Sequence, residues 1–176
     1  MEMVVAKKVL AEWDRDGIFP NHLPELAAEP EAIESAEAAL GVVLDGEHRR
    51  FISFADGWKC FHQKVSLFGT QELVDGPLRA AALQSFEYAP ELLEDYGWSP
   101  ALLLPIAASL EQADVFVMPV GDRGRVDPRV HWLAEGELID TFETFGQFFV
   151  SMIDHTTYRV AKLRESASAE DASGQG

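Results

Sequence analysis

The sequence has a single cysteine, Cys60, and no run of about 20 apolar residues, the length that a membrane-spanning helix needs. One cysteine excludes an intramolecular disulfide framework and a zinc site built from a cysteine cluster. The first residues contain no apolar stretch of about 7–15 residues with a cleavage site after it. We therefore expect a cytoplasmic protein in which Cys60 is a free thiol.

Basic residues are also scarce. The chain has 14 lysines and arginines against 30 aspartates and glutamates, which gives a formal charge of −16. A small domain needs only about 2–8 units of net charge to stay in solution. The excess argues against nucleic acid or an anionic membrane as a partner, because both would repel the chain, and it permits a basic protein partner. Solubility alone is the other explanation of the acidity.

Motifs of the common enzyme classes are absent. No GxGxxG follows an expected strand, and the sequence contains no GxxxxGK[ST], HExxH, GxSxG or EF-hand loop. The absence of these motifs argues against catalysis without excluding it, and we expect no enzyme activity, no catalytic residues, no metal site and no cofactor.

Cys60 and His62 come closest to a catalytic pair. On a strand, residues two apart share a face, and a thiolate beside an imidazole can bind metal or act as a nucleophile. Two ligands do not complete a zinc site, however, which needs three or four. We therefore favour a buried thiol beside a partly exposed histidine. His48 lies on the apolar side of an expected helix and should be packed and hydrogen-bonded, whereas His131 should face solvent.

Nearly half of the 176 residues are apolar (47%), which is enough for one domain with a sizeable core. Apolar spacing and capping residues predict helices near 3–16, 31–40, 46–55, 78–86, 90–96 and 145–153. Short alternating segments predict strands at 64–68, 102–106, 114–118, 130–133 and 138–142. The short connections favour antiparallel hairpins, and the whole predicts an α+β fold in which helices flank a central, mostly antiparallel sheet. The domain should span residues 1–165, with a disordered tail at 166–176.

Two groups of residues are candidates for binding a protein partner. The first is Asp56 with Trp58, because a tryptophan directly after a helix-ending Asp-Gly is a good position for an exposed aromatic anchor. The second is an acidic helix end with two aromatic residues, which consists of Glu91, Glu94, Asp95, Tyr96 and Trp98. Core packing is the default for each tryptophan, and a solvated helix end is the ordinary alternative for the carboxylates.

Short pieces of the sequence resemble the SUKH superfamily, which contains the yeast Smi/Knr cell-wall synthesis regulators and many bacterial toxin-immunity proteins. The front piece is similar to the family's "I…E..LG..LP…..fl…nG" pattern and consists of Ile33, Glu37, Leu40-Gly41, Leu44, Phe51-Ile52 and Asp56-Gly57. The back piece consists of Leu104-Pro105-Ile106, Asp114, Val130 and the expected helix from Phe145 to Ile153. Together the pieces span about residues 31–155. Asp45 stands where the family usually has proline, and Asp56 where it often has asparagine.

The resemblance implies a SUKH-like α+β fold and a non-enzymatic protein-binding domain. Immunity proteins of this family bind and neutralise a cognate toxin, and a basic nuclease would suit the acidic chain. The yeast relatives imply an alternative, a regulatory or scaffold protein with several weaker partners. A weaker alternative is a metal- or cysteine-dependent hydrolase that uses Cys60, His62 or the acidic cluster.

Overall fold

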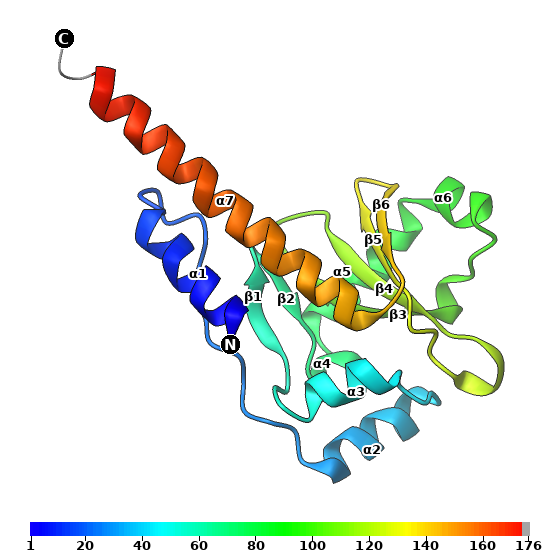
Figure 1. Cartoon of the computed structure of the whole chain (residues 1–176). Coiled ribbons are helices and arrows are strands. Elements are labelled where there is room, and N and C mark those ends of the chain that lie inside the picture. The colour runs from blue at the N-terminus through cyan, green and yellow to red at the C-terminus, as the bar shows by residue number, and fades with distance from the viewer. Residues whose placement is uncertain (174–176) are drawn as a thin grey trace.

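A computed structural model of the chain describes residues 1–173 (Figure 1). Helices precede, interrupt and follow the sheet, and none of the described helices is long and apolar enough to cross a membrane. The helices are α1 (Glu2–Trp13), α2 (Pro30–Leu40), α3 (Gly46–Ile52), α4 (Thr70–Val74), α5 (Pro77–Glu87), α6 (Pro90–Asp95) and α7 (Phe145–Ser173). The strands are β1 (Trp58–His62), β2 (Val65–Leu67), β3 (Leu103–Ala108), β4 (Val115–Pro119), β5 (Val130–Ala134) and β6 (Glu137–Phe142).

The six strands form one antiparallel sheet in which each strand pairs with the next along the chain, in the order β1-β2-β3-β4-β5-β6. This order confirms the predicted α+β fold with an antiparallel sheet. Strand β1 and helix α4 lie where the sequence predicts no element. Strand β1 lacks regular alternation because its pairing with β2 shifts register between Trp58 and His62, and Cys60 has a φ of 48°.

Helices cover both faces of the sheet (Figure 1). Helix α5 packs on β3, and α4 contacts both α5 and β3. The long helix α7 crosses the other face, where it contacts β6, α3 and, along its outer side, α1. Aromatic rings fill the space under α7: Phe148 lies 4.9 Å from Phe116 and 5.7 Å from Phe61 between ring centroids, and all three are fully buried.

The segment from α2 to α3 forms as its sequence predicts. Gly41 ends α2 with a φ of 67°, a left-handed conformation that glycine adopts without steric cost. The side chain of Asp45 accepts hydrogen bonds from the N–H groups of Glu47 and His48, which confirms the expected cap of α3. Glu37 joins the two helices, because it pairs with Arg49 and accepts a hydrogen bond of 3.0 Å from the Leu44 N–H.

The last helix extends further than the sequence predicts. Thr144 Oγ1 accepts a hydrogen bond of 3.2 Å from the Gln147 N–H, and Gln147 Oε1 accepts one from the Glu143 N–H, so the predicted capping pair forms. From there α7 continues through Ser173, so residues 166–173 of the expected tail are helical and 174–176 lie outside the described residues. Three of these eight residues are alanines, which favour a helix, whereas the expectation of a tail depended on the lack of aromatic residues.

Candidate partner-binding surface

The structure buries Trp58 and half-buries Asp56, although both line a hollow of about 350 Å³ beside β1. Trp58 is only 4% exposed, and its indole N–H donates a hydrogen bond of 2.8 Å to the carbonyl oxygen of His22. The expected exposure of Trp58 is therefore wrong. The physical reason is that the connection between α1 and α2 pairs its backbone with residues 56–57, through Leu26 and Glu25, and thereby covers the start of β1.

Asp56 has a structural role in this position. Its carboxylate accepts hydrogen bonds from the Thr70 N–H at 2.5 Å and from the Thr70 hydroxyl at 3.0 Å, and so holds the first turn of α4. Two backbone segments approach closely here, so a Cβ on Gly69 would clash with the Asp56 carbonyl oxygen. The Asp56 side chain thus fixes a turn and is committed to partners within the chain.

The other five predicted residues do come together, around the short helix α6. Glu91, Glu94 and Asp95 are all exposed on this helix, and they are followed by Tyr96, which is 51% exposed. The ring of Tyr96 stacks on the half-buried Trp98 at 4.8 Å between centroids. The carboxylates thus lie beside an aromatic pair that is partly open to solvent.

Strand β5 supports this aromatic pair through His131. The imidazole lies 4.6 Å from the Trp98 ring, and its Nδ1 is 2.9 Å from the Thr141 hydroxyl on β6. His131 is 6% exposed, so the expectation that it faces solvent is wrong, because Trp98 covers it. Burial, and secondarily the positive charge of Arg129, lowers the pKa of His131, so the supporting ring is neutral at pH 7.

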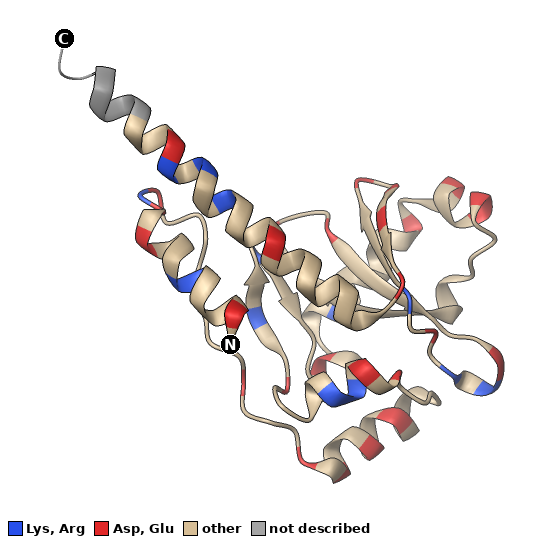
Figure 2. Ribbon diagram, viewed as in Figure 1, with Lys and Arg blue, Asp and Glu red and all other residues tan. Residues whose placement is uncertain are grey.

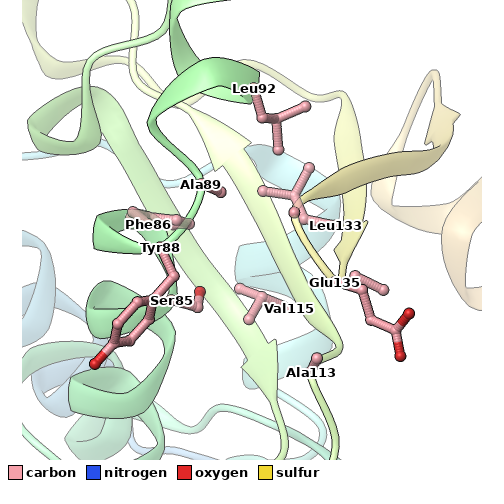
Figure 3. A pocket seen from close by; sticks show the side chains of 11 residues that line it. Ser85, Phe86, Tyr88, Ala89, Leu92, Ala113, Val115, Leu133 and Glu135 are labelled. Atoms are coloured by element: carbon pink, nitrogen blue, oxygen red, sulfur yellow. The ribbon is translucent and has the colours of Figure 1, made fainter.

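A cavity of about 260 Å³ opens beside the same helix, between the α5–α6 connection and strands β4 and β5 (Figure 3). Its walls are mostly apolar and are formed by Phe86, Ala89, Leu92, Val115 and Leu133. Tyr88, 76% exposed, and Glu135 also line it, and Figure 3 shows their side chains on opposite sides of the opening. Glu135 and Gly136 form the tight turn between β5 and β6, and both have a positive φ, as such two-residue turns require.

Positive charge is missing from this part of the sequence. Between Arg79 and Arg123 there is no lysine or arginine, whereas the same stretch contains seven acidic residues. Figure 2 shows acidic residues and no basic ones along α6. We call the surface formed by Tyr88, Glu91, Glu94, Asp95, Tyr96, Trp98 and Glu135 the acidic corner. The sequence analysis missed Tyr88, Glu135 and the cavity. The long stretch without basic residues was a signal for Tyr88, whereas Glu135 lies outside it.

Cys60 and His62 do not form an open catalytic pair. The irregular backbone at Cys60 interrupts the alternation that would place both side chains on one face. His62 is 4% exposed and packs against His155 at 5.9 Å and Trp132 at 6.3 Å between ring centroids. Burial, with a smaller contribution from nearby positive charge, lowers the pKa of His62 to about 4. Within residues 1–173, no cluster of three or more His, Cys, Asp or Glu side chains is placed to hold a metal ion.

His48 occupies a similarly dry position under α7. It is fully buried and stacks on Phe145 at 4.9 Å between ring centroids. The expectation of a packed ring is confirmed, but the expected hydrogen bond is not found, because neither ring nitrogen has a partner among the described residues. Burial lowers the pKa of His48 to about 3, so the ring is neutral at pH 7.

Comparison with known proteins identifies one family. A model of the SMI1 / KNR4 family (SUKH-1) matches residues 27–151. A search of curated protein sequences found no match to the chain. The matched residues include the whole sheet and the acidic corner, whereas α1 and most of α7 lie outside them.

Proposed function

Because the chain belongs to the SMI1 / KNR4 family (SUKH-1), we propose that it is a non-enzymatic immunity-type protein that binds and neutralises a basic protein toxin through its acidic corner. Membership of this family supports a protein of the immunity or regulator type. The acidic corner supports the choice of a basic partner, because it joins carboxylates to exposed aromatic rings and an apolar cavity.

The lack of a lysine or arginine in residues 80–122, the stretch that contains α6, carries this proposal. The carboxylates of Glu91, Glu94 and Asp95 have no lysine or arginine from residues 80–122 beside them in the sequence. None of the ion pairs found among the described residues involves these carboxylates, so a partner's basic side chains can pair with them without displacing one. The exposed Tyr96 ring adds a cation–π surface for an arginine or lysine, which is worth about 0.5–1 kcal/mol at an exposed site.

The cavity can contribute binding free energy that surface charge alone does not provide. Exposed ion pairs contribute only about 0–1 kcal/mol each, so they accelerate and orient association more than they strengthen it. Burying one leucine-sized side chain of the partner in the cavity would add about 1.5–3 kcal/mol. The corner thus fits a basic protein surface with a protruding apolar side chain at its centre.

A nuclease toxin is the class of partner that matches this chemistry best. A protein that holds nucleic acid presents lysine and arginine side chains to the phosphates. An acidic domain seated on those side chains would block the substrate and neutralise the toxin at once. A regulatory or scaffold role, with several weaker partners, is the alternative that the family name keeps open.

Affinity capture of the tagged protein from its own cells, with low-salt and high-salt washes and mass spectrometry, tests the proposal. We expect one stoichiometric basic partner that is lost at high salt. The triple variant Glu91→Lys, Glu94→Lys, Asp95→Lys should lose this partner.

A matched control separates the corner from general acidity. Glu29, Glu31 and Glu34 are also exposed and lie at the start of α2, so replacing all three by lysine changes the net charge equally. This control should retain the partner. Equal loss in both triple variants would contradict a specific role of the corner, and several weak partners would favour the regulator alternative.

A further inference from the structure

Helices α1 and α7 leave an apolar groove open to solvent. The groove has a volume of about 530 Å³, and its walls include Val5 and Val9 from α1 with Ile153 and Thr157 from α7. Val5 is 54% exposed, although the opposite side of α1 is already buried against α7. Helix α1 therefore has a second apolar face that the fold itself does not cover.

The two helices run in the same direction along this groove (Figure 1). Near the start of α1, the Thr156 hydroxyl lies 3.8 Å from Met3 Sδ, and near its end the Arg164 guanidinium lies 5.4 Å from the Trp13 ring centroid. Glu2 and Arg164 both line the groove. The groove therefore has an acidic residue at one end and a basic residue at the other.

The charge of this helix pair differs from that of the rest of the chain. Helices α1 and α7 contain five basic and six acidic side chains in 41 residues, a formal charge of −1, whereas the whole chain carries −16. Figure 2 shows the basic residues on α1 and along the middle of α7. A second copy would be repelled by most of the molecule and could approach this face without that cost.

We propose that the groove between α1 and α7 binds the same groove of a second copy, so that the protein forms a two-fold symmetric dimer. A two-fold axis across the middle of the groove makes the helix pairs antiparallel and buries the open faces of both α1 helices in a four-helix contact. The same axis brings Glu2 of each copy to Arg164 of the other. Arg164 can keep its contact with Trp13 while it pairs with a carboxylate, because a guanidinium has five N–H donors and a flat face.

The inference is independent of the proposed function. Helix α1 and α7 beyond residue 151 lie outside the part of the chain that matches the family. The dimer contact and the acidic corner are also formed by different elements. A failure of either proposal therefore leaves the other intact.

Light scattering coupled to size exclusion, over a range of protein concentrations, tests the dimer. We expect the wild-type protein to reach twice the chain mass of 19.5 kDa at micromolar concentrations. Ile153→Glu places a charge in the groove and should leave a folded monomer. Tyr158→Glu is the matched control, because Tyr158 is 60% exposed on the same helix and does not line the groove, and this variant should remain a dimer.

Charge reversal tests the antiparallel arrangement. Glu2→Arg and Arg164→Glu should each weaken dimerisation by about tenfold, and the double variant should restore it, since the reciprocal pair is then rebuilt with the charges exchanged. Circular dichroism confirms that each variant is folded. A wild-type protein that stays at 19.5 kDa at every concentration overturns the proposal, and so does a dimer that Ile153→Glu does not weaken or that the double variant fails to restore.

Discussion

The acidic corner and the α1–α7 groove both include an apolar hollow on the surface, but the residues around the two hollows carry different charge. Six of the corner's seven residues belong to a stretch of 43 residues, 80–122, without a lysine or arginine, whereas helices α1 and α7 together carry a formal charge of only −1. The apolar walls can contribute affinity in both places. The charge around them decides which partner can approach, a basic protein at the corner and a second copy at the groove.

The two regions also differ in their relation to the family. The corner is built on the sheet and lies inside the matched residues 27–151, whereas the groove is built from the two terminal helices and lies almost entirely outside them. The net charge of −16 is therefore not a uniform property of the surface. Most of the negative charge lies in the matched residues 27–151, and the terminal helices carry little of it.

The largest expected effect comes from the core that the two regions share. Phe148 is fully buried on α7 and packs against Phe116 and Phe142 of the sheet. Phe148→Ala should lower the free energy of unfolding by about 3–5 kcal/mol through a cavity, as measured by urea denaturation. If the two regions form one cooperative domain, tryptophan fluorescence and helical circular dichroism should shift together. Separate transitions would show that the terminal helices unfold independently.

Acid should weaken the α7 side of the sheet through two buried histidines, each with an effect at the lower end of that expected for Phe148→Ala. Burial lowers the pKa of His48 to about 3 and of His62 to about 4, whereas both titrate near 6.5 in the unfolded chain. The unfolded chain therefore binds more protons below pH 6.5, and stability is lost as the pH falls from there through the folded-state pKa values. By pH 4 each ring should cost about 3 kcal/mol. Thermal unfolding measured from pH 7 to pH 4 tests this loss.

The variant His48→Phe tests how much of the loss of stability in acid comes from His48. The phenyl ring retains the stack on Phe145 and has no proton to bind, so the melting temperature of the variant should fall less steeply with acid than that of the wild type. Parallel curves for the two proteins would contradict the assignment to His48.

Asp56→Ala should have an intermediate effect, on stability alone. The substitution removes two hydrogen bonds to Thr70 at the start of α4 and should cost about 1–2 kcal/mol. Because Asp56 lines neither the acidic corner nor the groove, partner capture and dimer mass should not change. Asp95→Ala is the control, since Asp95 is exposed and its loss should leave the unfolding midpoint nearly unchanged. A variant at Asp56 that loses a partner without losing stability would return this residue to the binding surface.

Local signals in the sequence predicted most of the fold. The caps at Gly41 and Asp45 and the spacing of apolar residues in α7 depend on neighbours within a few residues, so they can be identified from the chain alone. Strand β1 was missed because its irregularity at Cys60 depends on pairing with β2. The exposure of Trp58 was predicted wrongly because its cover comes from His22, 36 residues away in the sequence.

The sequence predicted the part of the candidate surface whose residues are neighbours along the chain. Glu91 to Trp98 are neighbours in the sequence, so their grouping was visible before the structure. The cavity is not local, because its walls come from α5, α6, β4 and β5, and Glu135 reaches it only through the turn between β5 and β6. A charge pattern can indicate that a surface exists, but the tertiary fold decides which apolar residues lie beside it.

The smallest expected effects are changes in the free energy of unfolding that have opposite signs in the two regions. Glu94→Gln should raise the free energy of unfolding by about 0.3 kcal/mol. Glu94 lies in the last turn of α6, where a negative charge opposes the helix dipole. It also lies three residues from the like charge of Glu91. Glu2→Gln should lower it by about 0.3 kcal/mol, because Glu2 lies in the first turn of α1, where a negative charge is favourable. Both substitutions should be measured in the Ile153→Glu background, which keeps the copies apart. A higher free energy of unfolding in Glu94→Gln would mean that the corner retains this carboxylate at a cost in stability, as expected of a side chain that serves binding. A lower free energy of unfolding would mean that Glu94 stabilises α6, and it would argue against a role in the partner surface.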